Sequence, residues 1–168
     1  MDKLIIRRAA SDDAEALLSY LNRVGGESDN LLFGADGFRD FPIVQEIEHI
    51  HAANSGKNAF LIGIDDGAIV ATAMLSVFGR ERIAHRGTVA LSVAKSCWHR
   101  GIGTAMLSEI IRYARNSGIA VLELTVREDN VHAIALYKKL GFVQIGIYEK
   151  YVCVDGRYYT SLLMNRYL

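Results

Sequence analysis

The segment from residue 87 to residue 117 constrains the fold of this chain more than any other part of the sequence. Residues 87–94 are apolar and partly β-branched, which predicts a strand. Residues 101–117 carry apolar side chains at helical spacing, with Ile102, Met106 and Ile110 on the inner face, and Gly118 ends this helix. A strand joined to a helix by a short glycine-containing turn is a building block of α/β folds, so we expect that fold class.

Further strands and helices are expected on both sides of this unit. Apolar runs predict strands at 3–8, 59–64, 68–78 and 119–126, and two more within 142–167 around Asp155-Gly156. Helices are expected after a cap at Ser11 or Asp12, from Pro42 with an apolar face of Ile43, Ile47 and Ile50, and over 130–140. Asp65-Asp66-Gly67 predicts a hairpin turn. The order of elements predicts a mixed α/β layer fold, with residues 1–168 forming one domain.

The composition limits the classes of partner. Nineteen basic residues balance nineteen acidic ones, whereas a nucleic-acid-binding domain usually has a basic excess, so we expect no nucleic acid. No apolar run approaches the ~18 residues of a membrane helix, and the N-terminus lacks the pattern of a secretory signal. Cys97 and Cys153 are too few and too isolated for a disulfide framework, so a reducing cytoplasm is the expected compartment.

The turn between the strand and the helix has the chemistry of a phosphate site. A helix N-terminus offers unpaired N–H groups and the positive end of a dipole, glycine lets a ligand approach the backbone, and Arg100 adds charge. The simpler alternative is a strand-to-helix turn that uses glycine for its conformation. A dinucleotide fingerprint would need glycine at Met106, and the P-loop ending is absent. The turn consists of His99, Arg100, Gly101, Ile102, Gly103 and Thr104.

Two motifs resemble the GNAT acetyltransferase superfamily. The first is Leu91-Ser92-Val93 followed by the run from Trp98 to Gly103, and the second is the run from Asn130 to Phe142. Trp98 departs from the Gln or Arg that the family often has there, which matters little if the loop binds through backbone N–H groups. The resemblance implies a central, mostly antiparallel, twisted sheet of about seven strands flanked by about four helices.

The same resemblance implies acetyl-CoA as cosubstrate, with its pyrophosphate on residues 99–104 and its pantetheine along the backbone of Leu91 and Val93. Asn130 and Tyr137 lie seven residues apart and therefore share one helical face. In the family the asparagine contacts or orders the pantetheine arm, and the tyrosine protonates the departing thiolate. The alternatives are that Asn130 caps its helix and that Tyr137 is a core aromatic residue.

Amine acetylation also needs a proton acceptor, and the sequence offers several. Histidine as a residue type can exchange protons near neutral pH, so His85 is the first candidate for a general base. Glu81, Glu27, Asp29 and Glu46 are further candidates, and deprotonation through water is an equal alternative. We expect no metal, because His49 and His51 are two residues apart on a predicted helix and so point in different directions.

The resemblance implies direct transfer of an acetyl group to a primary amine of a small molecule such as an amino acid, polyamine or antibiotic. The alternatives are acetylation of a protein N-terminus or lysine and, from another class, a noncatalytic acyl-CoA-binding module. In either enzymatic case residues 26–40 and 148–159 are expected to form the acceptor side. A homodimer is expected by analogy with relatives.

Overall fold

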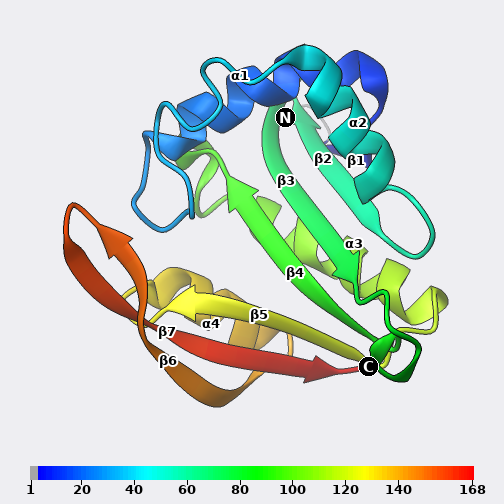
Figure 1. Ribbon diagram of the computed structural model, residues 1–168, viewed down its shortest axis with the longest axis vertical. Helices are drawn as coiled ribbons and strands as arrows, with labels where there is room; N and C mark the ends of the chain where they lie inside the picture. Colours follow the sequence, from blue (N-terminus) through cyan, green and yellow to red (C-terminus); the bar gives the residue numbers. More distant parts are fainter. Residues whose placement is uncertain (1–3) are drawn as a thin grey trace.

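The computed structural model describes residues 4–168 and consists of one seven-stranded sheet and four α-helices (Figure 1). The order of the strands across the sheet is β1-β2-β3-β4-β5-β7-β6. The expected mixed α/β fold is therefore confirmed, including the number of strands and helices. The strands are β1 (Ile5–Arg8), β2 (Ala59–Asp65), β3 (Ala68–Val77), β4 (Arg86–Val93), β5 (Val121–Arg127), β6 (Val143–Val154) and β7 (Arg157–Tyr167). The helices are α1 (Ala14–Gly25), α2 (Ile43–Ala53), α3 (Ile102–Asn116) and α4 (Val131–Lys139).

One pair of neighbouring strands is parallel, and it shapes the functional face. β4 and β5 are joined by the crossover helix α3, whereas all other neighbours pair antiparallel. The parallel register runs from Arg86 opposite Val121 to Thr88 opposite Glu123. Beyond Thr88 the two strands diverge, and Figure 1 shows β4 and β5 opening into a fork.

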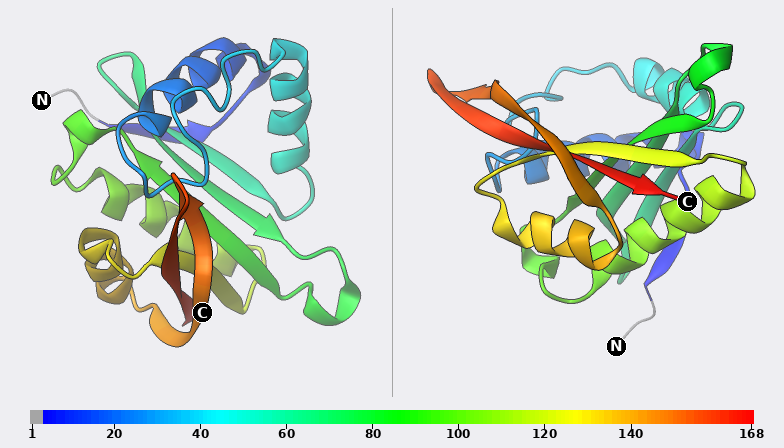
Figure 2. Two further views of the ribbon diagram at one scale, coloured as in Figure 1. Left: turned by 60° about the vertical axis from the view of Figure 1, so that its left-hand side comes forward. Right: turned by 90° about the horizontal axis from the view of Figure 1, so that it is seen from below.

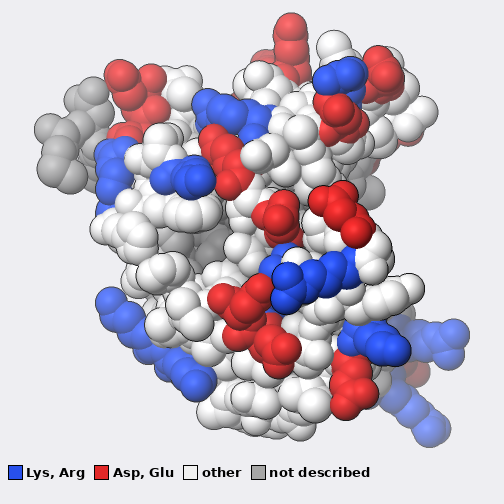
Figure 3. All heavy atoms as spheres, turned by 90° about the vertical axis from the view of Figure 1, so that its left-hand side faces the viewer, with Lys and Arg blue, Asp and Glu red and all other residues white. Residues whose placement is uncertain are grey.

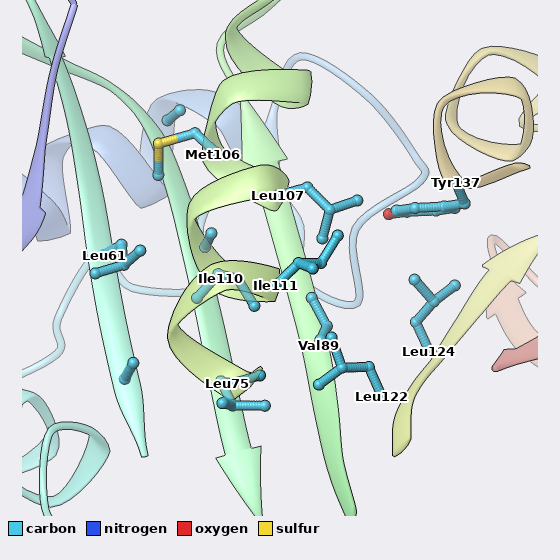
Figure 4. Close-up of a cluster of buried hydrophobic side chains, with 14 of the residues drawn as sticks. Leu61, Leu75, Val89, Met106, Leu107, Ile110, Ile111, Leu122, Leu124 and Tyr137 are labelled. Atoms are coloured by element: carbon cyan, nitrogen blue, oxygen red, sulfur yellow. The ribbon is translucent and has the colours of Figure 1, made fainter. Parts of the chain in front are cut away.

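The helices cover the two faces of the sheet in pairs. α1 and α2 pack on one face, and α3 and α4 lie on the other, as the right-hand view of Figure 2 shows for α3 and α4. Figure 4 shows Met106, Leu107 and Ile110 of α3 facing side chains from several strands. Such contiguous apolar burial provides most of the driving force for folding. Within residues 4–168, none of the helices is both long and apolar enough to cross a membrane.

Two hairpins form where the sequence predicted them. The β2–β3 turn has positive φ at Asp66 (49°) and Gly67 (72°), and the β6–β7 turn has it at Asp155 (48°) and Gly156 (78°). Positive φ at both central residues is the type I′ pattern, whose twist matches that of the flanking strands. The second hairpin projects from the sheet beside the 26–42 connection (Figure 1).

Two details of the helices differ from the sequence predictions. Ser11 and Asp12 do not cap α1, because they lie in a 3₁₀ turn whose Asp13 carboxylate accepts the Ala10 N–H at 2.8 Å. The buried face of α2 includes Glu46, which is 1% exposed, while Ile43 is 48% exposed. The start of the first predicted strand, residue 3, lies outside the described residues.

Candidate active site

The fork between β4 and β5 exposes backbone groups of β4. Ala94 donates its N–H to the carbonyl of Val70 on β3 at 2.8 Å. Because peptide groups alternate in direction along a strand, those of Val93 and Leu91 point away from β3 and into the fork. The Val93 carbonyl accepts the indole N–H of Trp98 at 2.8 Å, so its N–H remains the group directed at a ligand.

The loop after β4 presents free N–H groups to the same space. Gly101 adopts φ +81° and precedes α3 with no side-chain cap. The first α-helical hydrogen bond is from Ala105 N–H to the Gly101 carbonyl at 3.0 Å, which leaves the N–H groups of Ile102, Gly103 and Thr104 without helical partners. All of these residues except Ala105 line the cleft. This helix N-terminus is therefore suited to bind an anion.

The two glycines of the loop serve different physical purposes. A Cβ on Gly101 would meet nothing within 4 Å, so this glycine is required by its left-handed conformation. A Cβ on Gly103 would lie 3.2 Å from Leu136 Cδ2 and within 4 Å of Val93 and Leu91 side chains. Gly103 thus keeps open the narrow space between α3, α4 and β4, in which the side chains of Leu91 and Val93 lie.

The Arg100 side chain is directed to Asp65, and it also donates to Cys97 Sγ at 3.5 Å. Its guanidinium donates to Asp65 Oδ2 at 2.8 Å, it lies outside the cleft lining, and the pKa of Arg100 is raised mainly by this hydrogen bond. The expectation that Arg100 assists phosphate binding is therefore not supported by its position. His99 does line the cleft, with its ring 5.1 Å from that of His132 at the start of α4.

The second predicted motif reaches the cleft from α4. Asn130 caps α4, because its Oδ1 accepts the Ala133 N–H at 3.2 Å, and it also lines the cleft. Tyr137 is 8% exposed and its hydroxyl points from α4 toward α3 and β4 (Figure 4). Desolvation by burial raises the pKa of Tyr137 to about 12, so the phenol is protonated at neutral pH. The structure thus brings both residues to the space that Leu91 and Val93 border.

The cleft has a volume of about 1210 Å³ and passes through the fork to the opposite face of the sheet. There it is bordered by the 26–42 connection and the β6–β7 hairpin, the two segments expected on the acceptor side. Figure 3 shows acidic and basic side chains interspersed over one face of the molecule, without a large patch of one sign. The acceptor half contains apolar and aromatic side chains, among them Leu31, Phe33, Tyr148 and Tyr151.

The proposed general base lies elsewhere. His85 is exposed and precedes β4 at the closed end of the fork, outside the cleft lining, and Glu81 lies in the 3₁₀ turn before it. Sequence proximity to β4 was misleading because the strand separates His85 from Val93 by its whole length. Glu46 lies on the buried face of α2, with its Oε2 3.5 Å from His49 Nδ1, and does not line the cleft.

One acidic candidate does reach the cleft. Glu27 lines it, but Glu27 Oε2 accepts the Lys95 N–H at 2.7 Å and so fastens the 26–42 connection to the end of β4. Asp29 contributes its backbone carbonyl to Arg127 at 2.9 Å. Within residues 4–168, no three His, Cys, Asp or Glu side chains are grouped as a metal ion would require.

Sequence reasoning missed the polar residues on the acceptor face of the fork. Ser92 lines the cleft, and its Oγ lies 2.9 Å from the Tyr20 hydroxyl and 2.7 Å from Thr72 Oγ1. Arg127 of β5 lines it too, bonded to Asp129. Strand alternation was the available signal, because Ser92 points to the face opposite Leu91 and Val93.

Comparisons with known proteins agree with this geometry. The model of the Acetyltransferase (GNAT) family matches residues 30–142. The L-amino acid N-acetyltransferase AaaT of Escherichia coli K12 is 33% identical over 107 residues, which are 63% of this chain and 66% of that protein, so the match spans slightly less than two thirds of this relative. A GNAT-family acetyltransferase of Streptococcus pneumoniae superposes with TM-score 0.93 at 30% identity, covering 99% of both chains. The Salmonella typhimurium protein yncA, solved with its cofactor acetyl-CoA, has TM-score 0.87 at 18% identity over 99% of this chain and 95% of its own. The chain belongs to the acetyltransferase (GNAT) family.

Proposed function

We propose that this protein transfers the acetyl group of acetyl-CoA directly to a primary amine of a small molecule. The observation that supports it most is the fork, where the free N–H groups of α3, the Val93 N–H and the Tyr137 hydroxyl border one continuous cleft. The cleft is open to the α1–α2 face as well, so a second substrate has its own approach. AaaT of Escherichia coli, whose name states an L-amino acid substrate, is consistent with a small acceptor.

The residues of the cleft fit acetyl-CoA. The uncapped start of α3 would hold the pyrophosphate through backbone N–H groups, and the space that Gly103 leaves open would take the pantetheine arm. When bound, this cosubstrate supplies a thioester whose carbonyl carbon is open to attack. The Val93 N–H, fixed by the strand, would stabilise negative charge on the carbonyl oxygen.

In this proposal the amine nitrogen forms a bond to the carbonyl carbon, the carbon–sulfur bond breaks, and the sulfur takes up a proton. Tyr137 would donate a hydrogen bond and then this proton, since its phenol stays protonated at neutral pH. The amine would lose its proton through water in the cleft, which Glu27 also lines.

A thiol-release assay with acetyl-CoA and a panel of amino acids, polyamines, amino-group antibiotics and peptides tests the proposal. Release that depends on a small amine supports it. Release that depends on peptides alone would instead support a protein acetyltransferase. Binding of acetyl-CoA in calorimetry without release with any amine would show a noncatalytic acyl-CoA-binding module.

A further inference from the structure

Two hydrogen-bond donors lie on the acceptor side of the fork, one on each of its strands. The last parallel pair is Thr88 with Glu123, and four residues further along each strand are Ser92 of β4 and Arg127 of β5. Both lie four residues beyond that pair and therefore point to the same face of the sheet. Both line the cleft. Since the strands have diverged here, the space between the two side chains is open to a ligand.

The hydroxyl of Ser92 can donate to a ligand. Its Oγ lies 2.9 Å from the Tyr20 hydroxyl and 2.7 Å from Thr72 Oγ1. Tyr20 and Thr72 are 2% and 8% exposed, and their hydroxyls also interact with each other. A buried hydroxyl left without an acceptor costs about 1–3 kcal/mol. When a ligand accepts the Ser92 proton, Tyr20 and Thr72 can still donate within the cluster, so all three hydroxyls keep an acceptor.

Arg127 also retains donors. It is 9% exposed, and Nε donates to Asp129 Oδ1 at 2.9 Å, Nη2 donates to Asp129 Oδ2, and Nη1 donates to the Asp29 carbonyl at 2.9 Å. Its guanidinium lies 3.7 Å from the centre of the Tyr159 ring, which fixes its plane. A guanidinium has five N–H groups, so two remain beyond these three hydrogen bonds.

The acidic side chains of the acceptor half are already partnered. Glu123 forms an ion pair with Arg86, Asp129 pairs with Arg127, and the Glu27 carboxylate accepts the Lys95 N–H. The pairing of Glu123 and Asp129 with arginines leaves little negative charge here for the further ammonium groups of a polyamine. The N–H and O–H donors on this face match a ligand that brings oxygen acceptors of its own.

We propose that Ser92 and Arg127 bind the carboxylate of an α-amino acid, whose amino group is thereby placed at the fork for acetylation. This assignment rests on the proposed function and names its substrate class. In an α-amino acid the carboxylate and the amine are attached to the same carbon. If the amine faces Val93, the carboxylate would therefore lie on the acceptor side of β4. The Tyr20 and Thr72 hydroxyls act as positioning residues, because they keep the Ser92 proton directed to the ligand.

The test compares matched acceptors: L-leucine, L-methionine and L-phenylalanine, their amides, and the amines that lack the carboxylate. We expect kcat/KM of the wild type to be highest for the acids. Ser92→Ala should lower kcat/KM for the acids about tenfold to a hundredfold, the value of one hydrogen bond to a charged group, and leave the amines within about threefold. Ser76→Ala is the matched control, because Ser76 lies on β3 opposite Thr88, at the closed end of the fork. This variant should leave the ratio of kcat/KM for acids to kcat/KM for amines unchanged.

A double-mutant cycle tests the positioning role. Tyr20→Phe frees a lone pair on Ser92 and should lower the acid-to-amine ratio, but it should have no further effect on that ratio in the Ser92→Ala background. Arg127→Lys, which keeps the charge and loses the fixed plane, should raise KM for the acids.

Equal kcat/KM for acids and amines, faster turnover of amides than of acids, or an equal loss for both in Ser92→Ala would overturn the assignment while the acetyltransferase activity stands. Acetyl-CoA binding without consumption of any amine would instead remove the proposed function, and this assignment with it.

Discussion

Alanine variants of Gly101 and Gly103 at the start of α3, with Gly118 after α3 as the control, separate the effect of backbone conformation from that of ligand space. Gly101 and Gly118 both have positive φ, +81° and +72°. A Cβ on Gly101 meets nothing within 4 Å, and one on Gly118 meets only Lys57 Nζ at 3.9 Å. The two positions are thus matched in strain and in free space, but Gly101 lines the cleft and Gly118 does not.

The expected stabilities follow from this geometry. Alanine in the left-handed region costs about 1–2 kcal/mol, partly offset by about 0.4–1 kcal/mol from a less flexible unfolded chain. Gly101→Ala and Gly118→Ala should therefore each lose about 1 kcal/mol, or about 2–4 °C in Tm. Gly103 is the second residue of α3, so Gly103→Ala should gain less than the ~1 kcal/mol of a helix-interior position, against a 3.2 Å contact with the flexible Leu136 methyl. Its net change in stability should therefore be small.

Acetyl-CoA affinity should follow a different order. Gly101→Ala disturbs the N–H groups at the start of α3, and Gly103→Ala narrows the space beside Leu136, so each should weaken binding by about tenfold or more. Gly118→Ala should bind as the wild type does. Thermal unfolding and calorimetry measure the two quantities. Equal affinity for Gly101→Ala and Gly118→Ala would refute the placement of the pyrophosphate on this loop.

The other predictions concern single side chains. Tyr137→Phe should lower kcat about a hundredfold or more in the thiol-release assay with unchanged acetyl-CoA affinity, and an unchanged kcat would remove Tyr137 from the chemistry. Burial raises the pKa of Tyr20 and of Tyr137 to about 12, whereas a tyrosine in the unfolded chain has a pKa of about 10. The free energy of unfolding should therefore fall by up to about 3 kcal/mol per tyrosine as the pH rises from ~10 to ~12. Denaturant unfolding over this pH range should show a smaller loss in Tyr20→Phe and in Tyr137→Phe. Arg100→Gln should leave acetyl-CoA affinity within about threefold, because its guanidinium pairs with Asp65, and a larger loss in calorimetry would contradict this. His85→Ala should leave the pH profile of kcat/KM unchanged. If the variant loses one limb of this profile, His85 would be the general base after all.

The sequence predicted the features that depend on local pattern. Positive φ at Asp66 and Gly67 follows from the turn chemistry of two adjacent residues, and the approach of Asn130 and Tyr137 to one cleft follows from helical period. In both cases the residues that decide the outcome are close in sequence: they are adjacent in the hairpin turn, and about two helical turns apart in α4.

Features that depend on tertiary contacts were not predictable in the same way. Arg100 is adjacent to Gly101, but its side chain crosses to Asp65 at the end of β2. Glu46 was a candidate for the cleft by its acidity, and it lies instead on the buried face of α2. Long side chains on loops and helices choose partners from other elements, and their sequence neighbours do not indicate which.

Under the proposed function, alternation along β4 assigns its successive residues to two different substrates. Leu91 and Val93 turn their side chains toward α3 and their peptide groups into the fork, while Ser92 between them turns to the opposite face. A slip of one residue in the β3–β4 register would exchange these roles. The contact of Thr72 with Ser92 is a register pair of β3 and β4, and it also directs the Ser92 proton. We therefore infer that the contact that aligns these strands also sets acceptor selectivity, so weakening it should alter the choice of amine before it alters acetyl-CoA binding.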